Sequence, residues 1–257
     1  MILDNIVAYT KKRVEKNKEQ KLFEVLKKEV EALPISFDYP FEKALSKKGM
    51  SFICEVKKAS PSKGIIAQDF DYISIAKEYE RIGASAISVL TEPEFFKGND
   101  MYLAQIRENV QLPILRKDFI IDEYQIYEAK NIGADAILLI CEILEEQAFK
   151  KFLELAHSLG LSVLAEVHNE EQVSMAAAAG ARIIGVNNRD LTNFKVDINT
   201  SLRLAKLIPE GVIFVSESGI MNVDDIVKVK EAGADAVLIG EAFMRSDDKE
   251  KLIKGLR

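Results

Sequence analysis

The chain has 257 residues, of which 48% are hydrophobic, and its formal net charge is −6. This length suffices for one large domain, and the acidic balance argues against nucleic acid or an anionic membrane as the main partner. No apolar run approaches the roughly 20 residues that a membrane-spanning helix needs, and no apolar signal-peptide core opens the chain. We therefore expect a cytoplasmic protein whose two cysteines stay reduced.

Residues 1–48 precede the first predicted strand and are expected to form a helical extension. Apolar residues recur at helical spacing within residues 2–7 and again within residues 22–30. Pro34 and Pro40 interrupt the pattern, and a further short turn is expected at residues 41–45. Because a mobile tail would not carry so much apolar surface, we expect the extension to pack on the rest of the chain.

Short apolar runs follow one another along the rest of the chain, separated by segments with helical patterns. Asp71, Asp122 and Asn169 are predicted to cap the starts of helices, and Gly83 and Gly180 to end them. The runs themselves are almost continuously apolar, which is typical of parallel strands buried on both faces. The predicted strands are residues 52–57, 86–90, 113–117, 136–140, 162–167, 183–187, 212–217 and 236–240.

A Gly-Ala pair recurs four times, at intervals of about 50 residues, and each time it ends a helical stretch and opens an apolar run. Two strands and two helices per repeat predict a (β/α)8 TIM barrel. We expect residues 1–257 to form this single domain, with residues 1–48 packed on it as the N-terminal helical extension. A doubly wound sheet is the competing architecture, but it lacks the fourfold regularity, and no GxGxxG follows the first strand.

Polar side chains end five of the predicted strands. In a barrel of this kind the carboxyl ends of the strands form the active site, so we expect these side chains to converge. Each could instead be a structural ion pair or a surface residue, but lysines and carboxylates gathered in one cavity suit proton transfer. The candidate catalytic residues are Glu55, Lys57, Lys117, Glu166, Asn187 and Glu217.

The direction of the side chains in the first strand is a test of this interpretation. Because side chains alternate along a strand, Glu55 and Lys57 point to one side and Cys54 to the other. If the charged pair faces the barrel axis, Cys54 lies under the helices. The two histidines, His157 and His168, have no Cys, Asp or Glu at ligand spacing, so we expect no metal site.

Loops after the last two strands carry signals for a phosphate. Ser218-Gly219 and Gly240-Glu241 stand where barrels of this kind commonly bind phosphate through backbone N–H groups, although each glycine could be a turn residue only. Ser60 is a further candidate donor. Apolar side chains near other strand ends could hold a flat apolar part of a substrate: Phe96, Phe119 and Leu138.

At these residues the chain resembles the indole-3-glycerol phosphate synthase family. The likeness covers essentially the whole chain. The segments that begin at residues 55 and 115 are specific for this family when they occur together. The matching segments, in family order, are EVKKASPS at 55–62, LRKDF at 115–119, LAEV at 164–167, GVNNRD at 185–190 and SESGI at 216–220.

The resemblance implies an enzyme that closes an indole ring without a cofactor. The substrate would be 1-(2-carboxyphenylamino)-1-deoxyribulose 5-phosphate, which loses carbon dioxide and water. Lys117 would act as general acid on the ribulose carbonyl, and Lys57 would hold the carboxylate and serve as acid in the dehydration. Glu55 and Glu166 would take or relay protons, and Glu217 would place and polarise these groups.

The resemblance also assigns the binding residues. Asn187 and Arg189 would lie near the anthranilate end, and the three apolar candidates around its ring. Ser60, Gly219 and Gly240 would bind the phosphate, with Ser218 and the backbone of Glu241 beside them. The partner is thus a small phosphorylated substrate, and the chain could be a monomer or a homodimer.

Two rival functions stay open at this point. The resemblance places the enzyme in tryptophan biosynthesis, and the neighbouring isomerase of that pathway is also a phosphate-binding barrel. That isomerase is expected to need a thiol base at the top of the first strand. Cys54 has the wrong parity for that role if Glu55 faces inward. A barrel that has lost catalysis and only binds a partner is the other rival. It would not be expected to keep every charged strand end.

Overall fold

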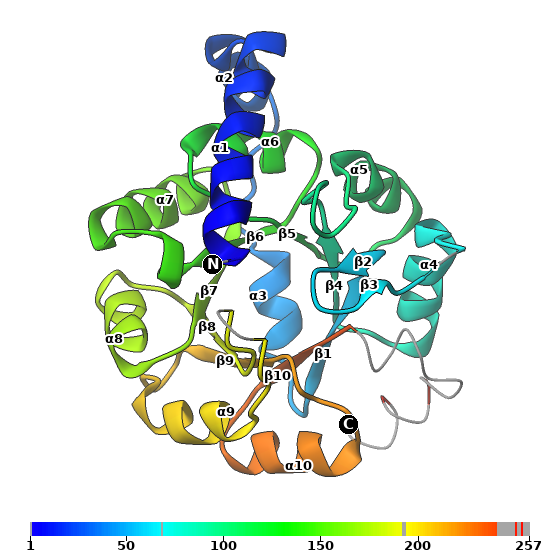
Figure 1. Ribbon diagram of the computed structural model, residues 1–257, viewed down its shortest axis with the longest axis vertical. Helices are drawn as coiled ribbons and strands as arrows, with labels where there is room; N and C mark the ends of the chain where they lie inside the picture. Colours follow the sequence, from blue (N-terminus) through cyan, green and yellow to red (C-terminus); the bar gives the residue numbers. More distant parts are fainter. Residues whose placement is uncertain (1, 68, 192–193, 241–249, 251–252, 254–257) are drawn as a thin grey trace.

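In the part of the chain that the computed structural model describes, eight parallel strands close into a barrel (Figure 1). The described residues are 2–67, 69–191, 194–240, 250 and 253. Each strand pairs with the next along the chain, and the last pairs with the first, which confirms the predicted barrel. The strands are β1 (Ser51–Val56), β4 (Ala86–Leu90), β5 (Ile114–Lys117), β6 (Ala136–Ile140), β7 (Ser162–Val167), β8 (Ile183–Asn187), β9 (Ile213–Glu217) and β10 (Ala236–Ile239).

Helices alternate with these strands and surround the barrel (Figure 1). A short antiparallel hairpin, β2 (Ala59–Ser60) with β3 (Gly64–Ile65), follows β1. Of the helix that the repeat predicts after β10, the structure describes residues 250 and 253, and both are helical. The helices of the outer layer are α4 (Tyr72–Ile82), α5 (Asp100–Asn109), α6 (Glu123–Asn131), α7 (Glu146–Ser158), α8 (Glu170–Ala178), α9 (Asn199–Leu204) and α10 (Val223–Glu231), with the short 3₁₀ turns η1 (Cys141–Ile143) and η2 (Ala205–Leu207).

Local signals fix where these helices begin and end. The side chains of Asp71, Asp122 and Asn169 each accept a hydrogen bond from a main-chain N–H two or three residues on, at 2.9 to 3.0 Å. These bonds satisfy N–H groups that the first turn of a helix leaves unpaired. Gly83 ends α4 in the left-handed conformation, with φ at 95°. The predicted caps are confirmed, and strand ends differ from the predicted ones by one residue at most.

The strands separate two hydrophobic cores. Alternate residues point into the barrel, where Ile53 and Leu138 belong to the inner core. Their neighbours Cys54 and Leu139 point outward into a larger core between strands and helices. Cys54 therefore lies under the helices, as its parity predicts, and its thiol is buried.

The N-terminal extension covers both ends of the barrel. Its helices are α1 (Ile2–Gln20), α2 (Phe23–Glu31) and α3 (Pro40–Leu45). Phe41 and Leu45 of α3 enter the inner core beside the start of β1, and Leu3 and Ile6 of α1 enter it from the carboxyl end. Figure 1 shows α1 running from near the barrel centre outward past its rim, with α2 beside α6. Among the described residues, none of the helices is long and apolar enough to cross a membrane.

Candidate active site

A cavity of about 710 Å³ opens at the carboxyl ends of the strands. Every site residue predicted from the sequence lines it, except Glu241, which lies outside the described residues. The lining residues from that prediction are Glu55, Lys57, Ser60, Phe96, Lys117, Phe119, Leu138, Glu166, Asn187, Arg189, Glu217, Ser218, Gly219 and Gly240. The barrel thus brings together residues that are up to 185 positions apart in the sequence, from 55 to 240.

Lys117, at the end of β5, lies between two carboxylates. Its Nζ is 3.3 Å from Glu166 Oε2 on β7 and 3.2 Å from Glu217 Oε2 on β9. Both carboxylates are almost fully buried, so the ammonium group is the main charge that offsets them. The other oxygen of Glu217, Oε1, is buried and has no hydrogen-bond partner among the described residues, so it can accept a proton.

The pKa values of Lys117, Glu166 and Glu217 differ, because burial and the neighbouring charges affect each group differently. Burial alone would lower the pKa of Lys117, but the charges of Glu217, Glu166 and Glu55 outweigh it and hold that pKa above its ordinary range. Burial would raise the pKa of Glu166, yet the charge of Lys117 and other contacts keep it below its usual value. Burial raises the pKa of Glu217 to about 7. At neutral pH the site therefore combines a charged lysine, an ionised carboxylate and a carboxyl that titrates.

A second charged pair lies at the end of β1, which β10 separates from β9 in the barrel. Lys57 Nζ contacts Glu55 Oε1, and the Glu55 side chain is nearly fully buried. Gly240, at the end of β10, makes room for this pair. A Cβ at that position would lie 2.5 Å from Glu55 Oε1 and 3.2 Å from Lys57 Nζ. Gly185 does the same for Glu217, whose Oε1 would lie 2.2 Å from a Cβ there.

Amide and imidazole groups surround Glu166. Asn187 Nδ2 donates to Glu166 Oε1 at 3.1 Å, and the main-chain N–H of Arg189 donates to Asn187 Oδ1 at 3.0 Å. His168 Nε2 lies 3.6 Å from the same Glu166 oxygen. Sequence reasoning considered His168 only as a metal ligand and missed this position, although it is two residues from Glu166. Among the described residues, no three His, Cys, Asp or Glu side chains gather as a possible metal site.

Part of the cavity wall is apolar. The rings of Phe96 and Phe119 are 6.0 Å apart between centroids and tilted by 35°. Leu138 on β6 lines the same wall, and so do Leu3 and Ile6 from α1. The sequence predicts that the extension packs on the barrel, but no local signal shows that α1 reaches the cavity.

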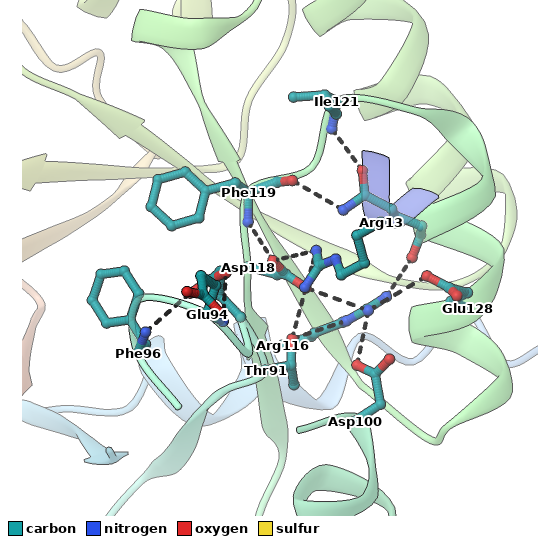
Figure 2. A network of polar contacts seen from close by, with 12 residues as sticks. Arg13, Thr91, Glu94, Phe96, Asp100, Arg116, Asp118, Phe119, Ile121 and Glu128 are labelled. Carbon is teal, nitrogen blue, oxygen red and sulfur yellow. Dashed lines mark hydrogen bonds and ion pairs between the residues drawn. The ribbon is translucent and has the colours of Figure 1, made fainter. Parts of the chain in front are cut away.

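Behind Lys117 and Phe119, a buried polar network joins β5 to α1 (Figure 2). Asp118 accepts both hydrogen bonds of Arg13, at 2.8 and 2.9 Å, and a third from the N–H of Phe119 at 2.8 Å. Arg116, which is 1% exposed, pairs with Asp100 at 2.8 Å and lies 3.4 Å from Asp118. Burial would raise the pKa of Asp118, but the charges of the two arginines hold it below its ordinary value. The network therefore anchors the backbone at Asp118, and with it the neighbouring Lys117 and Phe119.

The raised pKa of Glu217 predicts a pH dependence of stability. The folded state binds this proton more tightly than the unfolded chain, where the pKa is about 4.3. The stabilisation is therefore fully present below about pH 4.3 and is lost as the pH rises through about 7. We expect Glu217→Gln to remove this loss, measured as the free energy of urea unfolding between pH 4 and 8. The exposed Glu210→Gln is the control, and an equal loss in wild type and Glu217→Gln would contradict the raised pKa.

Comparisons with known proteins show which family the chain resembles in sequence. A family model described as indole-3-glycerol phosphate synthase matches residues 3–256. A protein of that name from Ruminiclostridium cellulolyticum is 53% identical over 257 residues, covering 100% of this chain and 99% of the relative. Another from Endomicrobium trichonymphae is 55% identical over 257 residues, covering 100% of both.

A solved structure shows the fold in a more distant protein. The 3-hexulose-6-phosphate synthase from Salmonella typhimurium covers 80% of this chain and 95% of its own, with a TM-score of 0.64. At 13% identity this likeness concerns the fold alone. The family match and the two full-length relatives concern the sequence itself, and by them the chain belongs to the indole-3-glycerol phosphate synthase family.

Proposed function

We propose that the protein is a carboxy-lyase that converts 1-(2-carboxyphenylamino)-1-deoxyribulose 5-phosphate to indole-3-glycerol phosphate. In this reaction a carbon–carbon bond forms between the ring carbon that bears the carboxylate and the ribulose carbonyl carbon. Carbon dioxide and then water leave, and the indole ring is complete. The observation that supports this proposal most directly is Lys117 held between Glu166 and Glu217 in the cavity wall.

Lys117 is proposed as the general acid of ring closure. Its ammonium group is charged at neutral pH, because three glutamates raise its pKa, and it faces the cavity. A proton donated to the ribulose carbonyl oxygen makes the carbonyl carbon more electrophilic, and the ring carbon then attacks it. The electron pair of the departing carboxylate restores the aromatic ring as carbon dioxide leaves.

The dehydration needs an acid for the departing hydroxyl and a base for a proton of the substrate. We assign Lys57 to the acid and to holding the carboxylate before it leaves. Glu166 is ionised and is the proposed base, with Glu55 relaying protons through its contact with Lys57. Glu217 would place Lys117 and, because its pKa is near 7, exchange a proton with it.

The proposed binding residues form two groups, one for the aryl end of the substrate and one for its phosphate. Phe96, Phe119 and Leu138 would hold the aryl ring on the apolar wall, with Asn187 and Arg189 near its carboxylate. The backbone N–H groups after β9 and β10 would bind the phosphate. The loop residues proposed for this end are Ser60, Ser218, Gly219 and Gly240, all of which line the cavity.

The domain organisation, cellular location and partners of the protein belong to the same proposal. Because α1 contributes to the cavity wall, we propose that the extension and the barrel form one domain across residues 1–257. We propose a cytoplasmic enzyme with a small phosphorylated substrate and without a nucleic-acid partner. A monomer and a homodimer are both compatible with a site built from one chain.

The proposed reaction can be tested by indole fluorescence. Because the chain has no tryptophan, protein emission does not mask that of an indole. Purified protein is mixed with the proposed substrate, without added metal or nucleotide, and indole fluorescence is followed with and without a chelator. We expect a rise that survives the chelator. Binding without any rise would contradict the proposed reaction.

A further inference from the structure

One buried carboxylate at the carboxyl end of the barrel has no part in the proposed chemistry. Glu92 follows β4 by two residues and is fully buried. Its Oε1 accepts a hydrogen bond from the N–H of Glu94 at 3.0 Å. Its Oε2 accepts from the N–H groups of Phe95 and Phe96, at 2.7 and 3.0 Å. The loop is therefore folded around this side chain.

The same residue also closes the loop through its main chain. The carbonyl of Glu92 accepts a hydrogen bond from the N–H of Gly98 at 2.8 Å. In the described part of the chain, the partners of the carboxylate are main-chain N–H groups rather than a basic side chain. Hydrogen bonds to a charged acceptor are about twice as strong as neutral ones, so Glu92 sets the backbone path of residues 92–98.

This loop presents two successive aromatic rings to different neighbours. The ring of Phe96 lies beside that of Phe119 on the cavity wall (Figure 2). The ring of Phe95 packs edge-on against Tyr9 of α1, with centroids 6.1 Å apart and an interplanar angle of 87°. Because Glu92 binds the N–H groups of both residues, one carboxylate holds the backbone that carries both rings.

We propose that Glu92 is a positioning residue that holds Phe96 against the aryl ring of the substrate. The inference rests on the proposed function, because it needs an aryl group in that part of the cavity. Without the carboxylate, three N–H groups lose their acceptor and the loop must find other partners, so Phe96 is no longer held in one place. The reacting groups on β5, β7 and β9 keep their own contacts, so the loss falls on substrate binding.

The experiment compares variants of this loop. Glu92→Gln replaces one acceptor oxygen by a donor, and Glu92→Asp keeps the charge and both oxygens on a shorter side chain. Glu94→Gln is the matched control, because that side chain is exposed in the same loop. The readouts are kcat and KM by indole fluorescence and the affinity for inorganic phosphate. Circular dichroism shows that each variant is folded.

We expect Glu92→Gln to raise KM by about tenfold, which corresponds to one charged hydrogen bond, and to change kcat less. Glu92→Asp should raise KM to a smaller extent, and Glu94→Gln and the phosphate affinity should stay as in the wild type. Adding Glu92→Gln to Phe96→Ala should change KM little further, because the two act through the same ring. If Glu92→Gln does not fold, Glu92→Asp alone and combined with Phe96→Ala tests the same coupling.

Other outcomes would overturn the proposal. One is a wild-type KM in the folded Glu92 variants. Another is a loss that is fully additive with Phe96→Ala, which would mean that the carboxylate acts elsewhere. Failure of the proposed function would be seen separately, as no indole from the wild type. In that case, affinity for a non-reacting analogue with the carbonyl reduced to an alcohol replaces KM in the same comparison.

Discussion

Replacement of Lys117 by alanine is expected to lower kcat by about a thousandfold or more, within the range that a general acid contributes. The ammonium group is the proposed proton donor, and its Nζ is within 3.3 Å of both carboxylates. A water molecule in place of the ammonium group would not be protonated at neutral pH and would be a far weaker acid. Phosphate affinity should be largely kept, because the loops after β9 and β10 do not depend on this side chain. The measurement is single-turnover indole fluorescence.

The control is Lys150→Ala, which removes an exposed lysine from α7 and should keep full activity. Loss of Lys117 also leaves two buried carboxylates without their cation, so one of them should take up a proton. Circular dichroism and a urea titration show whether the fold survives this change. Near-normal turnover in folded Lys117→Ala would exclude this lysine as the acid.

The largest effect on stability is expected at Arg116. Methionine fills a similar volume but leaves the carboxylate of Asp118 with one cation fewer, and those of Asp100 and Glu128 without theirs. The arginine also donates to the carbonyl of Gln125 at 2.8 Å, and this hydrogen bond would be lost. Removing one partner of a buried ion pair costs about 3–5 kcal/mol, so Arg116→Met should lower the free energy of unfolding by about that much.

Arg203→Met is the matched control for this prediction. Arg203 also pairs with a carboxylate, that of Glu170, but both side chains are about half exposed. Exposed pairs contribute about 0–1 kcal/mol, so the control should unfold close to the wild type. Both variants are compared by urea unfolding at neutral pH. Equal midpoints for the two variants would show that the buried network does not stabilise the barrel.

The fold could be predicted because its signals are local and repeated. An N-cap such as Asp122 acts on an N–H two residues away, so the chain shows it without tertiary information. The apolar strands recur with the Gly-Ala repeat, and only a closed barrel uses all of them. The direction of Glu55 and Cys54 also follows from the period of a strand, and both point as expected.

The remaining features depend on contacts between distant segments. Arg13 and Asp118 are 105 residues apart, and nothing near either one indicates the other. The entry of Leu3 and Ile6 into the cavity wall likewise depends on where α1 crosses the barrel. Glu92 was missed for a different reason: its partners are main-chain N–H groups, which every residue but proline has, so no residue type reveals them.

The alternation along the strands also separates two tasks that a mutational library could address independently. Glu166 points into the cavity, and its neighbours Ala165 and Val167 point into the outer core that attaches the helices. Substitutions at inward strand ends thus alter which groups a bound molecule meets, and substitutions one residue away alter how firmly the helical ring is attached. A search for new reactions on this scaffold should vary the first set and leave the second untouched.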